Sequence, residues 1–479
     1  MQNNYQGPPA NFAMVVPVPV VLQKEDVKTL PREVFDRVDQ LAAPRLVEYW
    51  EVDPCYVEPQ YDERRVLRGG APPPTAVPTD AADDLGVKIE AQFTVGEYEV
   101  VILSAQDSTG LDTWLRQGKY TIPEGAEPVL RPYVQAGMKF FVAKVDVTKV
   151  AFDAKGQAML SPLRFHYDSE QFNLPVRLGL INSAGDQDLL VHILAAKRYE
   201  VANYPNAFIP TNLEVKDSVR DEFGKFYVSL FDAVLKQTPK AVVTEYSWQA
   251  NNCDPCPQTP LQAPELVTLG ADALPKYQQR LQQSDGSLEW SMPGEFVLTR
   301  LHARYSKEAL GEDLVFREAP EVVGGREEGE AFKLPQGATR SGVNNFQARY
   351  IIRHEWQGKI ACQNPIRGRW GGPWPDWHGG GSQAPRAAKG LAFADRTGSL
   401  GMYVARAVPA LAVVPADAAP AETGPVKVES AKPEAVEARA DGKPTAANKA
   451  GGCACDAGSG AGAGGLLGLV LLGLRRRRI

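Results

Sequence analysis

Cysteines are the residues of this chain whose chemistry depends most directly on their spacing. The chain has 6 cysteines, two of them in the C-terminal tail. The remaining four belong to the body of the protein: Cys55, Cys253, Cys256 and Cys362. In an oxidising compartment an even set of cysteines in an ordered domain is usually disulfide-bonded, so two bridges are expected. Three pairings are open, and the one that joins Cys253 to Cys256 and Cys55 to Cys362 is favoured.

The C-D-P-C spacing of Cys253 and Cys256 could also serve two other chemistries. A redox-active CxxC pair normally sits in a thioredoxin-like βαβ context, which does not surround this one, and Pro255 lies inside the motif. A zinc site needs four ligands, and neither a second cysteine pair nor a C-x-x-H partner follows. We therefore expect neither a catalytic dithiol nor a metal site, and no cofactor.

The histidines give no catalytic motif. His302 alternates with Arg300 and Arg304 and is expected on a solvated strand face, whereas His354 shares an apolar face and is expected to be a hydrogen-bonded core residue. The chain has no H-E-x-x-H, no G-x-S-x-G and no phosphate-binding loop. A hydrolytic enzyme is therefore disfavoured, and no catalytic residue is assigned.

Two further sets of residues remain possible sites. The Gly/Pro-rich loop from Arg369 to His378 contains three tryptophans: Trp370, Trp374 and Trp377. Exposed Trp rings suit a sugar or a protein partner, but the favoured alternative is that they cover a sheet edge. Arg367 or Arg369 stacked on one ring would suit either interpretation. An enzyme could also assemble its site from dispersed acids that spacing does not reveal, such as Asp168, Glu170 and Asp186.

The C-terminal tail combines three signals that belong to a membrane. It consists, in order, of Cys453 and Cys455, the uncharged residues 457–474, and the cluster Arg475, Arg476, Arg477 and Arg478. As a helix the uncharged part would span about 27 Å, close to one hydrocarbon core. The arginines would resist translocation and stay in the cytoplasm. The pattern predicts a single C-terminal membrane helix.

This order of parts closely resembles the MYXO-CTERM sorting tail of myxobacterial surface proteins, although Asp456 stands where a basic or small residue is more usual. The resemblance implies processing near Cys453 or Cys455 by a membrane protease of the myxosortase type, and a protein left at the cell surface. A plain single-span anchor is the alternative. Either interpretation exports the body.

Export calls for a signal that the first residues do not show. Met1 to Phe12 has neither the basic nor the apolar region of a signal peptide. The run from Phe12 to Leu22 is too short to span a membrane and carries Pro17 and Pro19, which favour an extended strand. We expect that the true start, with a signal peptide, lies upstream of Met1, the alternative being leaderless export.

Composition is that of a folded extracellular body. The chain has 479 residues, 44% of them hydrophobic, which is enough for one to three domains. Because 52 Lys and Arg stand against 58 Asp and Glu, with no basic face outside the tail, nucleic acid is not an expected partner. Shifts in composition predict four parts: a body at 1–260, a continuation or second β-rich subdomain at 261–408, a disordered Pro/Ala/Glu linker at 409–450, and the tail at 451–479.

Hydrophobic periodicity predicts an α+β fold with mainly antiparallel sheet. Leu30 to Trp50 is expected to form two short helices that break at Pro44, and Gly69 to Asp84 an exposed loop. Further helices are expected at Leu111–Gln117 and Glu222–Lys236. Strands are expected at Glu97–Leu103, Lys139–Val150, Phe296–Tyr305 and Phe346–Trp356.

Segments within about the first 260 residues closely resemble the bacterial domain-of-unknown-function family 2330. They are Asn11–Val20, Gly110–Leu115, Leu160–Asn182, Arg198–Val215 and Asn251–Pro257. Members usually carry a secretion signal and a further Cys-bearing stretch ahead of the Pro-Val-Pro segment. The resemblance implies no activity, because the family is named for lacking one.

We therefore expect a surface-anchored α+β envelope protein with a structural or interaction role, and we do not expect an enzymatic activity. Its expected partners are the membrane, a myxosortase-type protease, and a glycan or another envelope protein. A binding module that uses the Trp-rich loop and an enzyme with a site of dispersed acids are the alternatives.

Overall fold

The computed structural model describes most of the body and one segment of the tail. The described residues are 1–3, 13–56, 87–120, 122–152, 158–181, 185–254, 256–282, 292–306, 311–326, 334–371, 386–387, 398–417 and 469–476. Residues 1–416 and 466–479 form one compact unit, and Asp417–Gly465 form a second. The expected loop at Gly69–Asp84 lies outside the described residues, as does the expected linker at 409–450 apart from residues 409–417, in which Pro409–Leu411 forms a short 3-10 helix.

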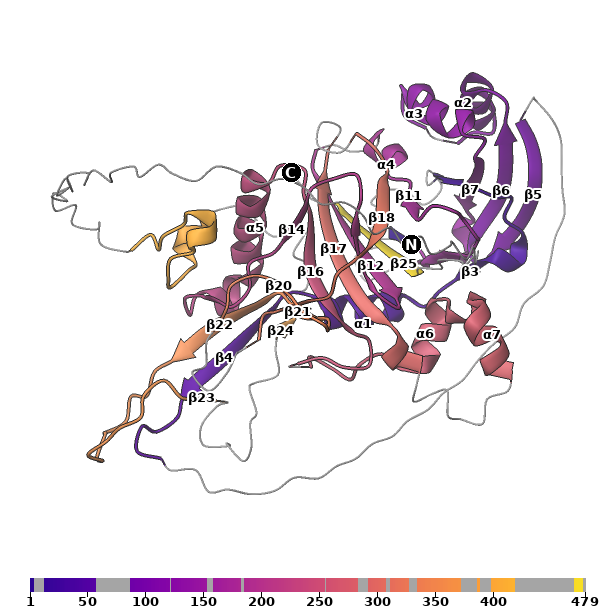
Figure 1. Cartoon of the computed structure of the whole chain (residues 1–479). Coiled ribbons are helices and arrows are strands. Elements are labelled where there is room, and N and C mark those ends of the chain that lie inside the picture. Colours follow the sequence, from indigo (N-terminus) through magenta and orange to yellow (C-terminus); the bar gives the residue numbers. More distant parts are fainter. Residues whose placement is uncertain are drawn as a thin grey trace, which may run out of the picture. The chain divides into compact units, whose positions relative to one another are not determined.

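A mainly antiparallel sheet of nine strands is the centre of the first unit (Figure 1). Its path runs β1 (Gln2–Asn3), β25 (Leu469–Arg476), β12 (Gln187–Ala195), β17 (Val297–Tyr305), β16 (Val242–Gln249), β21 (Asn345–Gln347), β19 (Val322–Gly324) and β20 (Thr339–Arg340), and β14 (Asn206–Phe208) also pairs with β16. The sheet therefore takes strands from both sides of position 260.

The predicted strand at Phe296–Tyr305 is confirmed as β17, which is buried along its whole length. It pairs with β12 in a continuous register from Gln187 opposite Tyr305 to Ala195 opposite Val297. Its pairing with β16 shifts between Thr244 and Tyr246, so Glu245 is the extra residue of a β-bulge. A bulge re-aims a side chain, and such irregularities often occur at sites that matter to function.

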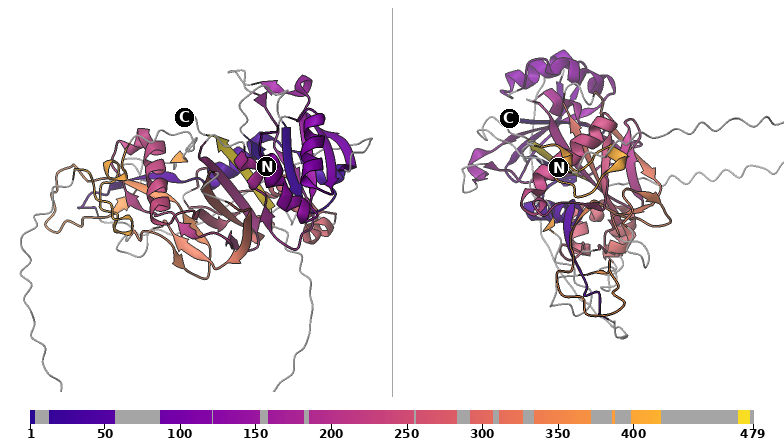
Figure 2. Two further views of the ribbon diagram at one scale, coloured as in Figure 1. Left: turned by 90° about the horizontal axis from the view of Figure 1, so that it is seen from above. Right: turned by 90° about the vertical axis from the view of Figure 1, so that its left-hand side faces the viewer.

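A second, four-stranded antiparallel sheet has the order β2, β7, β6 and β5. The bounds are β2 (Ala13–Val18), β7 (Lys139–Val145), β6 (Tyr98–Ala105) and β5 (Val87–Val95). The helices α2 (Ser108–Gln117) and α3 (Ala126–Gln135) cover one face (Figure 2), where Leu111 and Leu130 pack on Leu103 and Phe140. The extended strand expected after Phe12 is confirmed as β2, at one end of the sheet order.

A third sheet contains a strand, β4 (Arg45–Glu51), where the sequence predicted a second short helix. Its strands are β15 (Leu213–Glu214), β22 (Arg349–His354), β4 (Arg45–Glu51), β23 (Trp370–Gly371) and β24 (Arg386–Ala387). The first half of Leu30–Trp50 is helix α1 (Arg32–Ala42), but the second half is the strand β4 rather than a helix. Pro44 ends the helix, and the bulky residues that follow pair in parallel with β22.

The remaining elements are short, apart from α5 (Val219–Gln237). The strands are β3 (Val27–Thr29) with β10 (Leu163–Phe165), β8 (Ala151–Phe152) with β9 (Ala158–Met159), and β18 (Leu314–Ala319) between β11 (Asn173–Leu174) and β13 (Arg198–Val201). The helices are α4 (Arg177–Ile181), α5 (Val219–Gln237), α6 (Ala263–Leu269) and α7 (Pro275–Gln282). Of these, α5 packs Phe226, Leu230 and Phe231 into the core that also holds Val243 of β16.

The described part of the tail differs from the expected membrane helix. Leu469–Arg476 forms β25, which pairs antiparallel with β12 and parallel with β1. Two physical reasons favour the strand: the glycines of the tail lower its helix propensity by about 1 kcal/mol each, and β12 offers backbone groups that β25 satisfies. Within the described part of the chain, every helix is too short or too polar to cross a membrane.

Candidate functional site

The four body cysteines form two disulfides, in the pairing that the sequence favoured. Cys55 bonds to Cys362, which we call the long-range bridge, and Cys253 bonds to Cys256, which we call the local bridge. The loss of chain entropy in the unfolded state predicts that the two bridges stabilise the fold to different extents. Closing a separation of 307 residues is worth about 5–6 kcal/mol, whereas closing one of 3 residues is worth about 2 kcal/mol.

The long-range bridge fastens the chain after β4 to the loop after β22. The carboxylate of Glu51 holds the same loop, because it accepts hydrogen bonds from the backbone N–H groups of Trp356 (3.0 Å) and Gly368 (2.8 Å) and from Arg367 (2.9 Å). Burial alone would raise the pKa of Glu51, but these donors outweigh it and hold the pKa below its usual range. The bridge and Glu51 together make this loop a cross-linked part of the fold.

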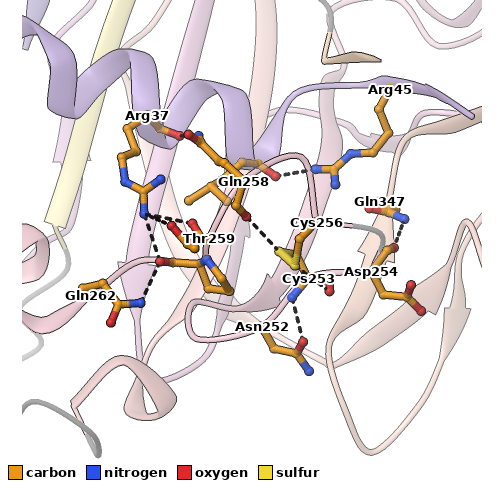
Figure 3. The surroundings of a disulfide bond; sticks show 12 residues. Arg37, Arg45, Asn252, Cys253, Asp254, Cys256, Gln258, Thr259, Gln262 and Gln347 are labelled. Carbon is orange, nitrogen blue, oxygen red and sulfur yellow. Dashed lines mark hydrogen bonds between the residues drawn. A yellow bond between two sulfur atoms is a disulfide. The ribbon is translucent and has the colours of Figure 1, made fainter. Parts of the chain in front are cut away.

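The local bridge lies in the loop between β16 and α6 (Figure 3). Cys253 is buried, with 7% of its surface exposed, whereas Cys256 is exposed. Gln347 of β21 donates to the carbonyl of Asp254, and Arg326 pairs with its carboxylate. The local bridge therefore lies in an outer loop, and contacts with the central sheet and α1 hold this loop in place.

Trp370 is the described member of the Trp-rich loop; Trp374 and Trp377 lie outside the described residues. Trp370 is half-buried in β23, which pairs with β4, and the guanidinium of Arg353 stacks 4.7 Å from its ring centre. Arg367 and Arg369, the residues expected to stack there, instead contact Glu51 and the carbonyls of Asp53 and Tyr56. Trp370 thus belongs to a strand at the edge of the third sheet, and its ring contacts Arg353 of that sheet.

The densest group of ionisable side chains is a buried ionic cluster on one face of the central sheet. Its five members come from β12, β16 and β17: Asp188, Glu245, Arg300, His302 and Arg304. Alternation along β17 aims Arg300, His302 and Arg304 to the same face, and the register puts Asp188 opposite Arg304. The bulge adds Glu245, which is fully buried.

Glu245 is the centre of this ionic cluster. Its carboxylate accepts a hydrogen bond of 2.6 Å from Nε of Arg300 and lies 2.6 Å from Nδ1 of His302. The hydroxyl of Tyr227, from α5, donates to the same carboxylate. Burial alone would raise the pKa of Glu245, but His302 and Arg300 outweigh it and lower the pKa to about 2. Glu245 is therefore an anion at neutral pH.

His302 lies between two carboxylates. Its Nε2 is 3.2 Å from Oδ1 of Asp188, and its ring stacks on Phe231 of α5 at 3.9 Å between centres. Burial would lower the pKa of His302, but Glu245 and Asp188 outweigh it and raise the pKa. The arrangement favours an imidazolium whose two N–H groups each donate to one carboxylate.

Three further side chains, Asp39, His192 and Asp232, contact the arginines of the ionic cluster at its edge. Arg300 also contacts Oδ1 of Asp39 in α1, at 2.5 Å, and Nε2 of His192, at 3.3 Å. Arg304 donates to Asp188 at 2.8 Å and pairs with Asp232 of α5, a side chain with 37% of its surface exposed. The ionic cluster therefore joins the sheet to α1 through Arg300 and to α5 through Arg304.

This geometry supports a structural role better than proton transfer. A general acid or base must reach a substrate and exchange its proton near the working pH. Here Glu245 is held as a carboxylate and Tyr227 as a phenol, because burial and the neighbouring Glu245 charge raise the pKa of Tyr227 well above its usual value. In the described ranges, moreover, no three or more His, Cys, Asp or Glu side chains are placed to hold a metal ion.

The structure corrects the expected placement of His302, which is buried rather than solvated. The residues that make this burial possible, Asp188 and Glu245, were not predicted. The signal was present in the charged alternation of β17, but nothing in the sequence showed which carboxylates would face it. His354 is half-buried, bonded to Glu48 at 2.9 Å and stacked on Trp50.

The remaining candidate residues are not members of this cluster, although Arg475 is the backbone partner of Asp188 in the register of β25 and β12. The dispersed acids Asp168, Glu170 and Asp186 are all exposed. In the tail, Arg475 and Arg476 belong to β25. Cys453, Cys455, Arg477 and Arg478 lie outside the described residues.

Comparison with known proteins gives one match. The family described as an uncharacterized protein conserved in bacteria (DUF2330) matches residues 1–317. This range includes β12, β16 and β17 and three of the four body cysteines. No curated protein and no solved structure matches the chain.

Proposed function

Because the chain belongs to the DUF2330 family of uncharacterised bacterial proteins, we propose that it is an exported, non-enzymatic component of the cell envelope, held at the cell surface by its C-terminal tail. Its role in this proposal is structural or interaction-bearing. The observation that carries the proposal is the state of the body cysteines, all four of which are paired. Disulfides persist in exported proteins and are rare in the reducing cytosol.

The long-range bridge supports export most strongly. It stabilises the fold by closing a very long loop, and this stabilisation exists only where the thiols stay oxidised. Glu51 holds the same loop through three donors, so the bridge is built into the architecture. In the reducing cytosol these thiols would not stay oxidised, so the bridge would not stabilise the fold.

The order of parts in the tail supports surface retention. A Cys pair, an uncharged apolar stretch and four arginines follow one another, as in the MYXO-CTERM sorting tail. The described segment is a strand, β25, when it pairs with β12. In a bilayer the same segment would have to form a helix, because lipid offers no partner for its backbone groups. Processing near Cys453 or Cys455 by a myxosortase-type protease would then retain the body at the surface.

The buried ionic cluster supports the non-enzymatic part of the proposal. Its carboxylates are shared among arginine, histidine and tyrosine side chains, and the members from the sheet are nearly inaccessible to solvent. Trp370, which could have supported glycan binding, instead lies in a strand that pairs with β4 and stacks with Arg353. A stable scaffold is the simplest use of such side chains.

The proposal is tested in a bacterium that naturally makes the protein. The double variant Cys453→Ala, Cys455→Ala should remain unprocessed or leave its normal location, as judged by intact mass and by cell fractionation. The matched control is Ser459→Ala, a small substitution in the same tail, which should behave like the wild type. An unchanged mature mass and location in the double variant would overturn the sorting role of the tail.

A further inference from the structure

The two cysteines of the local bridge differ in their exposure to solvent. Cys253 is buried and Cys256 is exposed, whereas both cysteines of the long-range bridge are half-buried. Thiol–disulfide exchange requires a thiolate to reach one sulfur of the bridge, so access decides which sulfur is attacked. The local bridge therefore has one sulfur, that of Cys256, which an external thiol can approach.

The loop does not depend on the local bridge for its position. It is closed by the hydrogen bond from the N–H of Leu261 to the carbonyl of Ala250, at 3.1 Å. Arg37 of α1 donates to the carbonyls of Thr259 (2.8 Å) and Pro260 (3.0 Å), as Figure 3 shows for Arg37 and Thr259. The amide of Gln258 returns a hydrogen bond to the carbonyl of Arg37, at 3.0 Å. Opening the bridge would leave each of these contacts in place.

Two arginines offset the negative charge on the residue next to the buried cysteine. Arg45 is fully buried and interacts electrostatically with the carboxylate of Asp254, the residue next to Cys253. Arg326 pairs with the same carboxylate and so offsets its repulsion of a thiolate. A neighbouring cation stabilises the thiolate form of cysteine.

We propose that the local bridge is a thiol–disulfide exchange site, at which an external thiol attacks Cys256. The thiolate of the external molecule bonds to Sγ of Cys256, and the bond between the two protein sulfurs breaks. Its electron pair goes to Sγ of Cys253, which leaves as a thiolate and takes a proton from water. A second external thiolate then attacks the external sulfur of the mixed disulfide, which releases Cys256 and oxidises the two external thiols to their disulfide.

The long-range bridge is the internal control for a test on the full chain. The folded, oxidised protein is incubated with reduced glutathione in increasing excess over oxidised glutathione, quenched with acid, alkylated and mapped by peptide mass spectrometry. The local bridge should open at a glutathione ratio that leaves the long-range bridge closed, and the mixed disulfide should appear on Cys256. Opening of the long-range bridge first, or at the same ratio, would overturn the proposal.

Two single variants test which sulfur reacts. In Cys253→Ser the remaining thiol is exposed, and in Cys256→Ser it is buried, so oxidised glutathione should modify the first at least about tenfold faster. Urea removes the difference if it arises from folding, and circular dichroism reports whether each variant is folded. Equal rates in the two folded variants would contradict the assignment of Cys256. If either variant fails to fold, the order of opening in the wild-type chain still decides the proposal.

Discussion

Replacing Glu245 by Gln tests whether the ionic cluster stabilises the fold. The substitution keeps the size of the side chain and an oxygen for the Tyr227 hydroxyl, but it removes the charge that faces Arg300 and His302. Removing one partner of a buried ion pair usually costs roughly 3–5 kcal/mol. Because Arg300 keeps Asp39 and His302 keeps Asp188, the expected loss lies at the lower end, about 3 kcal/mol.

Urea unfolding at pH 6, followed by tryptophan fluorescence and circular dichroism, measures this loss. The matched control is Glu318→Gln, which removes a surface pair with Lys197; the two side chains are 43% and 58% exposed. Such pairs contribute at most about 1 kcal/mol. If Glu245→Gln loses no more free energy of unfolding than the control does, the ionic cluster does not stabilise the fold, and the reasoning above is refuted.

Three further outcomes follow from the same structure. Replacing both cysteines of the long-range bridge by Ser should lower the free energy of unfolding by about 5–6 kcal/mol in urea titrations, against about 2 kcal/mol or less for the local bridge. Because the pKa of Glu245 is lowered to about 2 and that of His302 is raised, the ionic cluster contributes fully between about pH 4.5 and 6.5. Its contribution is lost as the pH falls towards 2, and also as the pH rises through the folded pKa of His302. His302→Gln should therefore remove the alkaline loss from a pH series of unfolding free energies. Trp370→Ala should lower the melting temperature by a few degrees, because the substitution removes the ring on which Arg353 stacks.

The sequence predicted the strands whose two faces differ. Alternation at Phe296–Tyr305 gave β17 almost to the residue, because one side packs on apolar neighbours such as Leu189. The same alternation misled where tertiary contacts decide the outcome. Arg300, His302 and Arg304 look like a solvated face until α1 and α5 cover them. A single sequence shows the charged alternation along the strand, but it does not show that two helices will cover these side chains.

Long-range partners were the part that spacing could not supply. Glu245 and His302 are 57 positions apart, and Asp188 and His302 are 114 apart, so their meeting depends on strand order and on one bulge. The strand β4 was missed for a similar reason, since the residues after Pro44 become a strand only because β22 lies beside them. Disulfide pairing was easier to anticipate, because two cysteines three positions apart can close on each other.

The location of the protein is the most direct test of its proposed function. Intact bacterial cells that make the protein are treated with an amine-reactive label that does not cross membranes, and a second sample is labelled after lysis. We predict that the protein is labelled to the same extent in both samples, while a cytosolic control protein is labelled only after lysis. Labelling of the protein only after lysis would contradict a role at the cell surface.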